Sequence, residues 1–195
     1  MTPSPVILEG KHARLEPLAP DHAVDLYDAG SDPEIWRYLP RDPFADAGDT
    51  RRWIAEALAA AGEGREVPFA IVARDSGRAA GSTRYLDIRP ADRALEIGWT
   101  WVGAPWQHTA INTDYKYLLL RHAFETLGAV RVQLKTDARN LRSQAAIERI
   151  GALREGTLRK HMVVRDGTVR DSIFFSVTDD EWPGVKVRLE GILAR

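Results

Sequence analysis

The pattern of apolar and polar side chains is clearest over residues 94–102, where large apolar residues occupy every second position: Leu95, Ile97, Trp99 and Trp101. Such alternation is typical of a β-strand. Apolar residues then recur at helical spacing over residues 113–127, and we expect Asn112 or Thr113 to cap this helix. A strand that leads through a short loop into a helix presents unpaired N–H groups to an anion, commonly a phosphate. An ordinary strand–helix junction is the alternative interpretation, because the P-loop and Rossmann motifs are both absent.

The same patterns predict the remaining elements. Strands are expected at 6–8, 13–18, 67–73, 79–88, 130–136, 158–164 and 169–177. Helices are expected at 20–29 with Asp21 as cap, from 31, from Asp49-Thr50 to 61, at 141–150 and within 179–193. Short links between consecutive strands predict antiparallel hairpins, including one at 165–168, where Asp-Gly favours a tight turn. Only the crossover through 113–127 predicts parallel neighbours. The fold class is therefore α+β, or mixed α/β, with a mostly antiparallel twisted sheet.

The amino-acid composition restricts the classes of protein and of site that the chain can belong to. The chain has 195 residues, which predicts a single domain over 1–195, and a formal net charge of −1. It has no cysteine, which excludes disulfides and thiolate sites and fits a reducing cytoplasm. No apolar run is long enough for a membrane span, and no signal peptide is evident. The five histidines are too far apart in sequence for a metal motif. We therefore expect a cytoplasmic protein without a metal or a membrane partner.

A second informative stretch is Asn140-Leu141-Arg142-Ser143. Taken alone, Asn140 is the N-cap of the helix 141–150. Ser143 has no histidine beside it in sequence and no surrounding G-x-S-x-G, so a hydrolase triad has no local support. In the proline-rich loop 35–44, aromatic side chains either line a pocket or pack on the core, and packing is favoured.

The order of these motifs resembles the GNAT superfamily of acyl-CoA-dependent N-acetyltransferases. The branch most similar to the chain contains the ribosomal-protein N-terminal acetyltransferases, of the RimJ and RimL type. The most specific pieces are Glu96-Ile97-Gly98-Trp99, Trp106-Gln107, Ala123-Phe124-Glu125, Asn140-x-x-Ser143, Gly151-Ala152 and Glu155-Gly156. The resemblance covers nearly the whole chain and implies a GNAT-like sheet that is splayed at its two middle strands and flanked by helices.

The resemblance also implies a coenzyme A site. Relatives bind the pyrophosphate under the pattern Gln/Arg-x-x-Gly-x-Gly/Ala, which here starts at Gln107 and places Ala110 and Asn112 at the glycine positions. The pantetheine arm pairs with the exposed edge of the central strand, and Gly98 is compatible with a bulge there. In the basic segment 128–165, Arg139 or Arg142 would meet the coenzyme A phosphates on a functional interpretation, whereas the charged faces of two amphipathic elements are the favoured alternative. The full set of implied coenzyme A contacts is Trp101, Val102, Gln107, His108, Thr109, Ala110, Ile111, Asn112, Thr113, Asn140 and Ser143.

For the chemistry, the resemblance places Ser143 near the thioester sulfur, where a hydroxyl steadies or protonates the leaving thiolate. Glu96 is the candidate base, with a structural ion pair as an equal alternative. The tyrosine that many relatives use as acid is Ile147 here, so that assignment does not transfer. His161 and His108 are secondary candidates, both more readily explained as structural or exposed.

The resulting hypothesis is an N-acetyltransferase that moves an acetyl group from acetyl-CoA to a primary amine by direct attack. The amine belongs to a protein N-terminus or to a small molecule. The implied acceptor groove is lined by Trp36, Tyr38, Phe44 and Met162. The alternatives are a GNAT-like domain that binds acyl-CoA without turnover, and a ribosome-associated module that uses the basic segment 128–165; nucleic acid is otherwise not an expected partner. Relatives often dimerise, so the resemblance implies a homodimer as one alternative for the oligomeric state of this chain.

Overall fold

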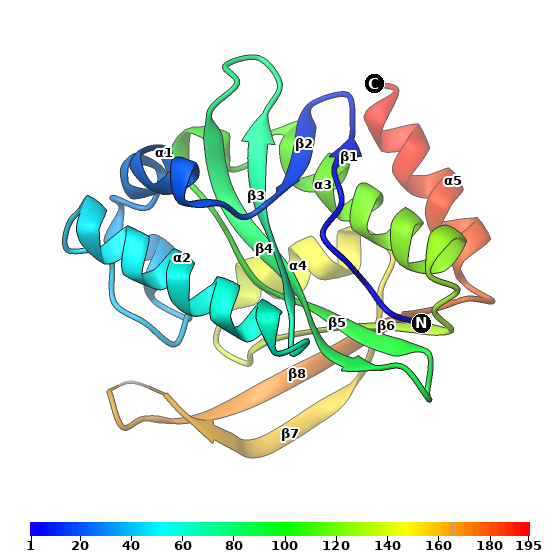
Figure 1. Cartoon of the computed structure of the whole chain (residues 1–195). Helices are drawn as coiled ribbons and strands as arrows, with labels where there is room; N and C mark the ends of the chain where they lie inside the picture. Colours follow the sequence, from blue (N-terminus) through cyan, green and yellow to red (C-terminus); the bar gives the residue numbers. More distant parts are fainter. Residues whose placement is uncertain (165) are drawn as a thin grey trace.

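A computed structural model describes every residue of the chain except 165, which belongs to the expected hairpin turn at 165–168. Eight strands form one sheet in the order β1-β2-β3-β4-β5-β6-β8-β7 (Figure 1). The strands are β1 (Leu8–Glu9), β2 (Ala13–Pro17), β3 (Val67–Ala73), β4 (Ala79–Arg89), β5 (Ala94–Val102), β6 (Arg131–Asp137), β7 (Leu153–Val163) and β8 (Val169–Thr178). The predicted fold class is confirmed.

The sheet is antiparallel except at its centre. There β5 and β6 are parallel, as the crossover through the intervening helix predicts, but only three residue pairs join them, from Ala94–Arg131 to Glu96–Gln133. Beyond Glu96, β5 stays paired with β4 as far as Val102 while none of its described residues pairs with β6. The two middle strands therefore splay apart.

A bulge in β5 interrupts the alternation expected for this strand. Gly98 pairs with Arg84 and Trp101 with Ser82, so β5 has one more residue than β4 between these two pairs. Trp99 adopts a positive φ of 50° at this point. Because one extra residue exchanges the two faces of a strand, Ile97 packs in one hydrophobic cluster and Trp101 in the other.

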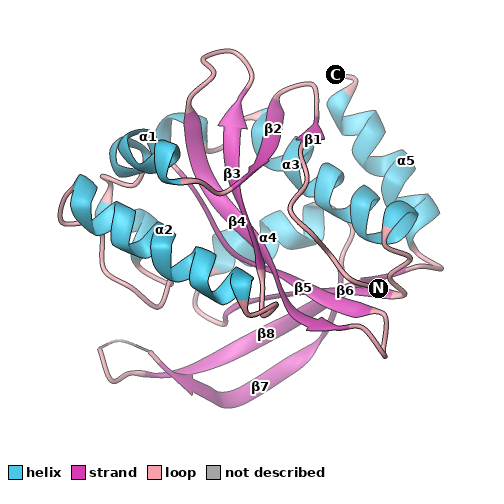
Figure 2. Ribbon diagram, viewed as in Figure 1, coloured by secondary structure: helices cyan, strands magenta, loops and turns pink. Residues whose placement is uncertain are grey.

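Helices cover both faces of the sheet (Figure 2). Helices α1 (Ala23–Ala29) and α2 (Ala47–Gly62) pack with Trp101 in one cluster. Helices α3 (Ala110–Arg121), α4 (Leu141–Arg149) and α5 (Trp182–Leu193) contribute to the larger cluster. No described helix has the length and apolar character needed to cross a bilayer.

Several predicted helix starts are wrong by a few residues. Helix α3 begins at Ala110, where the Thr109 hydroxyl accepts from the Ile111 amide and serves as cap. Asp114, expected in the first turn, is instead buried and accepts from the amides of His12 and Ala13. Similarly, α2 begins at Ala47 with Asp46 as its cap, ahead of the expected start at Asp49-Thr50.

At the first helix, residues Pro20–His22 form a 3-10 turn in which Asp21 caps nothing. The His22 ring accepts from the Ala19 amide there. Strand β7 also starts at Leu153, five residues before the expected position, because its exposed polar side chains hide the alternation that marks a strand.

Candidate active site

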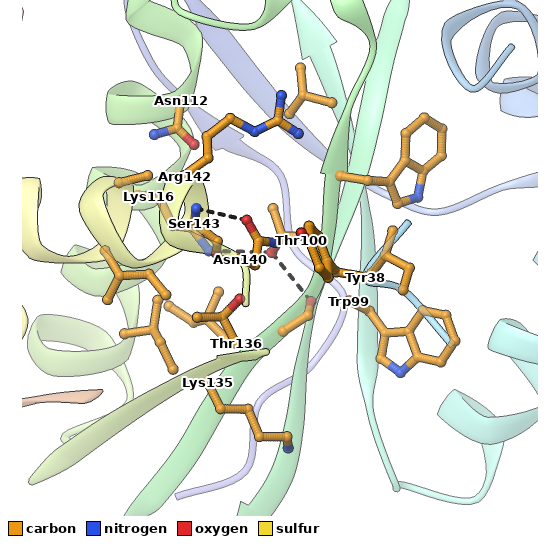
Figure 3. A pocket seen from close by; sticks show the side chains of 18 of the residues that line it. Tyr38, Trp99, Thr100, Asn112, Lys116, Lys135, Thr136, Asn140, Arg142 and Ser143 are labelled. Carbon is orange, nitrogen blue, oxygen red and sulfur yellow. Dashed lines mark hydrogen bonds between the residues drawn. The ribbon is translucent and has the colours of Figure 1, made fainter. Parts of the chain in front are cut away.

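The splay between β5 and β6 opens a cavity of about 690 Å³ (Figure 3). Its walls come from β5, β6, α3, α4, the β7–β8 hairpin and the loop at 35–40. In Figure 3, Asn140 and Ser143 lie on the α4 side, and Lys135 lies toward the β6 end. The cavity borders the edge of β5 at 97–102, which has no strand partner on the β6 side within the part of the chain that the structure describes. An extended ligand placed there meets backbone groups as an added strand would.

One end of the cavity is suited to an anion. Gln107, His108 and Asn112 line it, and His108 adopts a positive φ of 60° immediately before the N-terminus of α3. The first amides of a helix have no partner within the helix and carry partial positive charge. The Gln107 amide nitrogen donates to the Val102 carbonyl at 2.9 Å, and its oxygen accepts from Arg142 at 2.9 Å. Arg142 thereby brings a cation to the same end, whereas Arg139 is bound to Asp137.

The α4 wall presents the Asn140-x-x-Ser143 motif. Asn140 caps α4, because its side-chain oxygen accepts from the Ser143 amide at 3.0 Å (Figure 3). Both residues line the cavity, so the capping role and a ligand-facing position coexist. Ile147 lies further along the same wall and adds apolar surface.

Glu96 lies in the cavity where β5 and β6 part. Its carboxylate accepts two bonds from the Lys135 ammonium, at 2.6 and 2.7 Å, and one from Gln133 at 2.9 Å. Only 2% of Glu96 is exposed. The ion pair that sequence analysis kept as an alternative is therefore present, and the carboxylate would act on an amine with Lys135 beside it.

Lys116 is a cavity residue that sequence analysis missed. It projects from α3, donates to the Thr100 hydroxyl at 3.2 Å and is 7% exposed. Burial lowers the pKa of Lys116 to about 7, partly opposed by the attraction of Glu96. The sequence offers no signal, because a single lysine between Tyr115 and Tyr117 also fits the exposed face of a helix.

The acceptor side differs in part from expectation. Tyr38 and Met162 line the cavity, but Trp36 and Phe44 do not. Trp36 is fully buried and packs edge-on against Phe44, with ring centroids 4.8 Å apart, in the cluster that contains Trp101. The packing interpretation holds for these two rings because burial of large aromatic surface outweighs exposure in a groove.

The residues implied as coenzyme A contacts fall into two groups, those that line the cavity and those that do not. The cavity is lined by Trp101, Val102, Gln107, His108, Asn112, Asn140 and Ser143. Thr109, Ala110 and Ile111 instead border a separate hollow beside the turn at 74–76, and Thr113 is buried. Successive residues at the start of a helix point in different directions, so Asn112 lines the cavity while Thr109, Ala110 and Ile111 face the other hollow. Of the secondary candidates, His108 lines the cavity and His161 binds Ser172 beside it.

A family model for the acetyltransferase (GNAT) domain matches residues 12–153. The chain belongs to this family. The predicted family and its class of enzyme, the N-acetyltransferases, are thereby confirmed.

Named relatives agree with this assignment. "Putative ribosomal N-acetyltransferase YdaF" of Bacillus subtilis (strain 168) is 32% identical over 110 residues, which span 56% of this chain and 59% of that protein, less than two thirds of its length. The crystal structure of a GCN5-related N-acetyltransferase from Brucella melitensis is 31% identical, with a TM-score of 0.93 over 99% of this chain and 87% of that chain. Mycobacterium smegmatis RimJ in complex with CoA-disulfide shares the fold, with a TM-score of 0.82 at 22% identity over 96% of this chain and 95% of that chain.

Proposed function

We propose that the protein transfers an acetyl group from acetyl-CoA to a primary amine by direct attack. The observation that carries this proposal is the edge of β5 at 97–102, which is unpaired on the β6 side among the described residues and shares its cavity with His108 and Asn112 at the start of α3. A pantetheine arm needs such an edge and a pyrophosphate needs such amides. His108, the start of α3 and Arg142 would hold the phosphates, while Asn140 and Ser143 would flank the thioester.

The residues of the cavity suit each step of the reaction. The amine nitrogen forms a bond to the acetyl carbon, the carbon–sulfur bond breaks, and a proton passes from nitrogen to the thiolate. An α-amine, with a pKa near ~8, is partly neutral at physiological pH and needs little help to attack. The Glu96 charge would stabilise the positive charge that develops on nitrogen, and the Ser143 hydroxyl would donate to the departing sulfur.

The proposal also concerns the class of molecule that carries the acceptor amine. A relative named as a ribosomal N-acetyltransferase favours a protein N-terminus. A peptide would reach the cavity along Tyr38 and Met162, which line its acceptor side. Small-molecule amines are the second candidate class, because a cavity of about 690 Å³ also accommodates them.

Thiol release from acetyl-CoA across a panel of peptides and small amines tests the activity. We expect Ser143→Ala and Glu96→Gln to lower kcat by about 10- to 1,000-fold with coenzyme A affinity, measured by calorimetry, within about threefold. Ser31→Ala, at an exposed serine outside the cavity, is the matched control. Tight coenzyme A binding with no thiol release for any amine would support a binding domain without turnover. An absence of coenzyme A binding would overturn both interpretations.

A further inference from the structure

Arg170, the second residue of β8, is a buried cation that faces the cavity. It lines the cavity and is 8% exposed. Its Nε donates to the Ser172 hydroxyl at 2.9 Å, and its two terminal nitrogens make no ion pair with any carboxylate of the described residues. Neither terminal nitrogen belongs to the buried side-chain atoms that lack a hydrogen-bond partner, so both are open to the cavity, where a ligand can reach them.

The carboxylates near Arg170 are already bound to other cations. Glu96 accepts from Lys135 and Gln133. Asp137 accepts two bonds from the Arg139 guanidinium, at 2.8 and 3.0 Å, and one from the Arg139 amide. Lys135 and Arg139 are thus paired with these two carboxylates, and Arg170 has no ion pair among the described residues. Burial lowers the pKa of Arg170, while the charges of Asp137 and Glu96 act in the opposite direction.

The β7–β8 hairpin is shaped to keep Arg170 in place. Leu158 pairs with Ser172 and Met162 with Arg170, so β7 has two extra residues at this point, and Lys160 takes a positive φ of 51°. This bulge brings the His161 ring within 3.0 Å of Ser172. The Ser172 hydroxyl thus accepts from Arg170 and is placed to donate to His161, which fixes the orientation of the guanidinium.

We propose that the acceptor amine carries a carboxylate and that Arg170 binds it. The inference rests on the proposed acetyl transfer, because it names the class of acceptor for that site. A planar guanidinium offers two parallel N–H groups to a carboxylate, and the pair is strongest where water is excluded. Arg170 belongs to the hairpin side of the cavity, which carries the acceptor residue Met162, and not to α3 or α4, where the coenzyme would be held.

Two sources supply this chemistry: the α-carboxylate of a free amino acid, and an acidic side chain close to the N-terminus of a peptide. In both, the carboxylate is unchanged by the reaction. It orients the amine toward the acetyl carbon and supplies the carboxylate partner that Arg170 lacks among the described residues. Arg170 is therefore a specificity-determining residue of the acceptor site.

Matched acceptors test the proposal on the wild-type protein. Thiol release is measured for amino acids against their amides, and for peptide amides with Glu against Gln at the second position. We expect the acid of a pair to exceed its uncharged analogue by about 10- to 100-fold in kcat/KM. Preference for free amino acids or for Glu peptides distinguishes the two sources. Equal rates for acid and amide, with thiol release observed, would overturn the proposal and leave acetyl transfer intact.

Variants and a binding measurement complete the test. Arg170→Gln should remove the preference for the acid of each pair, and Arg170→Lys should keep part of it. Arg159→Gln, at an exposed arginine of the same hairpin, is the control. If no amine releases thiol, binding of N-acetyl amino acids and their amides to the coenzyme A-loaded protein decides. Selective binding of the acids, lost in Arg170→Gln, supports the site, and no selectivity overturns it.

Discussion

At the scale of single residues, Lys116 gives the clearest pH dependence. Burial lowers its pKa to about 7 in the folded protein, against about 10.4 in an unfolded chain. Between these values the unfolded state binds a proton that the folded state does not. The free energy of unfolding should therefore rise as pH increases above 7, by about 1 kcal/mol per pH unit from this group alone. Well below pH 7 both states bind the proton, so this gain is absent and the group adds no further pH dependence.

The substitution Lys116→Met isolates this effect. Urea unfolding at pH 7 and pH 9 should show that the wild-type protein gains about 2–3 kcal/mol relative to the variant over this interval. Lys11→Met, at an exposed lysine, provides the comparison. The same pH profile for wild type and Lys116→Met would contradict the assignment. The amine of Lys116 should then titrate near 10 in carbon-13 spectra of the labelled lysine.

Residues with a local role were easier to predict than residues with a spatial one. Asn140 caps α4 as its position before an apolar-periodic segment indicates. Lys116 and Arg170 have no such signal, because each owes its environment to a partner distant in sequence, Thr100 on β5 and the bulged strand β7. Trp36 and Phe44 show the converse, since an aromatic loop that resembles a pocket wall contributes to the core instead.

At the scale of elements, the close contact of β4 and β5 depends on Gly81. A Cβ added there would lie 2.1 Å from the Trp101 carbonyl oxygen, so the two strands would have to separate. Gly81→Ala should therefore destabilise the protein by about 2 kcal/mol or more and reduce coenzyme A affinity, since β5 carries the unpaired edge. Thermal unfolding and calorimetry measure the two effects.

Gly62 provides the matched substitution. It ends α2, and a Cβ there meets no atom within 4 Å. Gly62→Ala should leave stability unchanged or raise it by about 0.5–1 kcal/mol through helix propensity. Similar losses in both variants would show that glycine flexibility, and not the approach of Trp101, governs the position.

The periodicity of apolar residues identified the strands and helices. The starts of the helices depended instead on which residue caps the first amides. Strand β3 spans Val67–Ala73 and β5 spans Ala94–Val102, both as predicted, because continuous or alternating apolar residues define them. Helix α3 begins three residues early because Thr109 satisfies the first amides before Asn112 is reached. Asp114 is of a residue type that is common in the first turn of a helix, but its carboxylate accepts from the backbone of β2. The bulge at Trp99 directly follows Gly98, the mid-strand glycine that is compatible with a bulge.

At the scale of the whole molecule, the order of the last three strands was not foreseen. The sequence predicts a hairpin of β7 and β8 but not which of them joins β6. The structure places β8 in the interior, next to β6, where its alternating apolar residues Ile173, Phe175 and Val177 are buried. Strand β7, with exposed polar side chains, forms the edge, where charged residues discourage pairing with other chains.

The two halves of the sheet meet in only three residue pairs of β5 and β6, so a ligand placed in the splay would act as the missing part of the interface. Coenzyme A at one hundred times its dissociation constant should therefore slow amide hydrogen exchange over residues 97–113 by about 100-fold. This factor applies to amides that exchange only through openings from which the coenzyme first dissociates. Strand β1, which lies at the edge of the sheet opposite to β7 and has no residue in the cavity lining, should exchange at the same rate with and without ligand. Ser143→Ala should show the same protection as wild type, because its hydroxyl is assigned to the leaving thiolate and not to coenzyme affinity. Protection confined to other elements, with residues 97–113 unchanged, would place coenzyme A elsewhere and remove the basis for acyl transfer in this cavity.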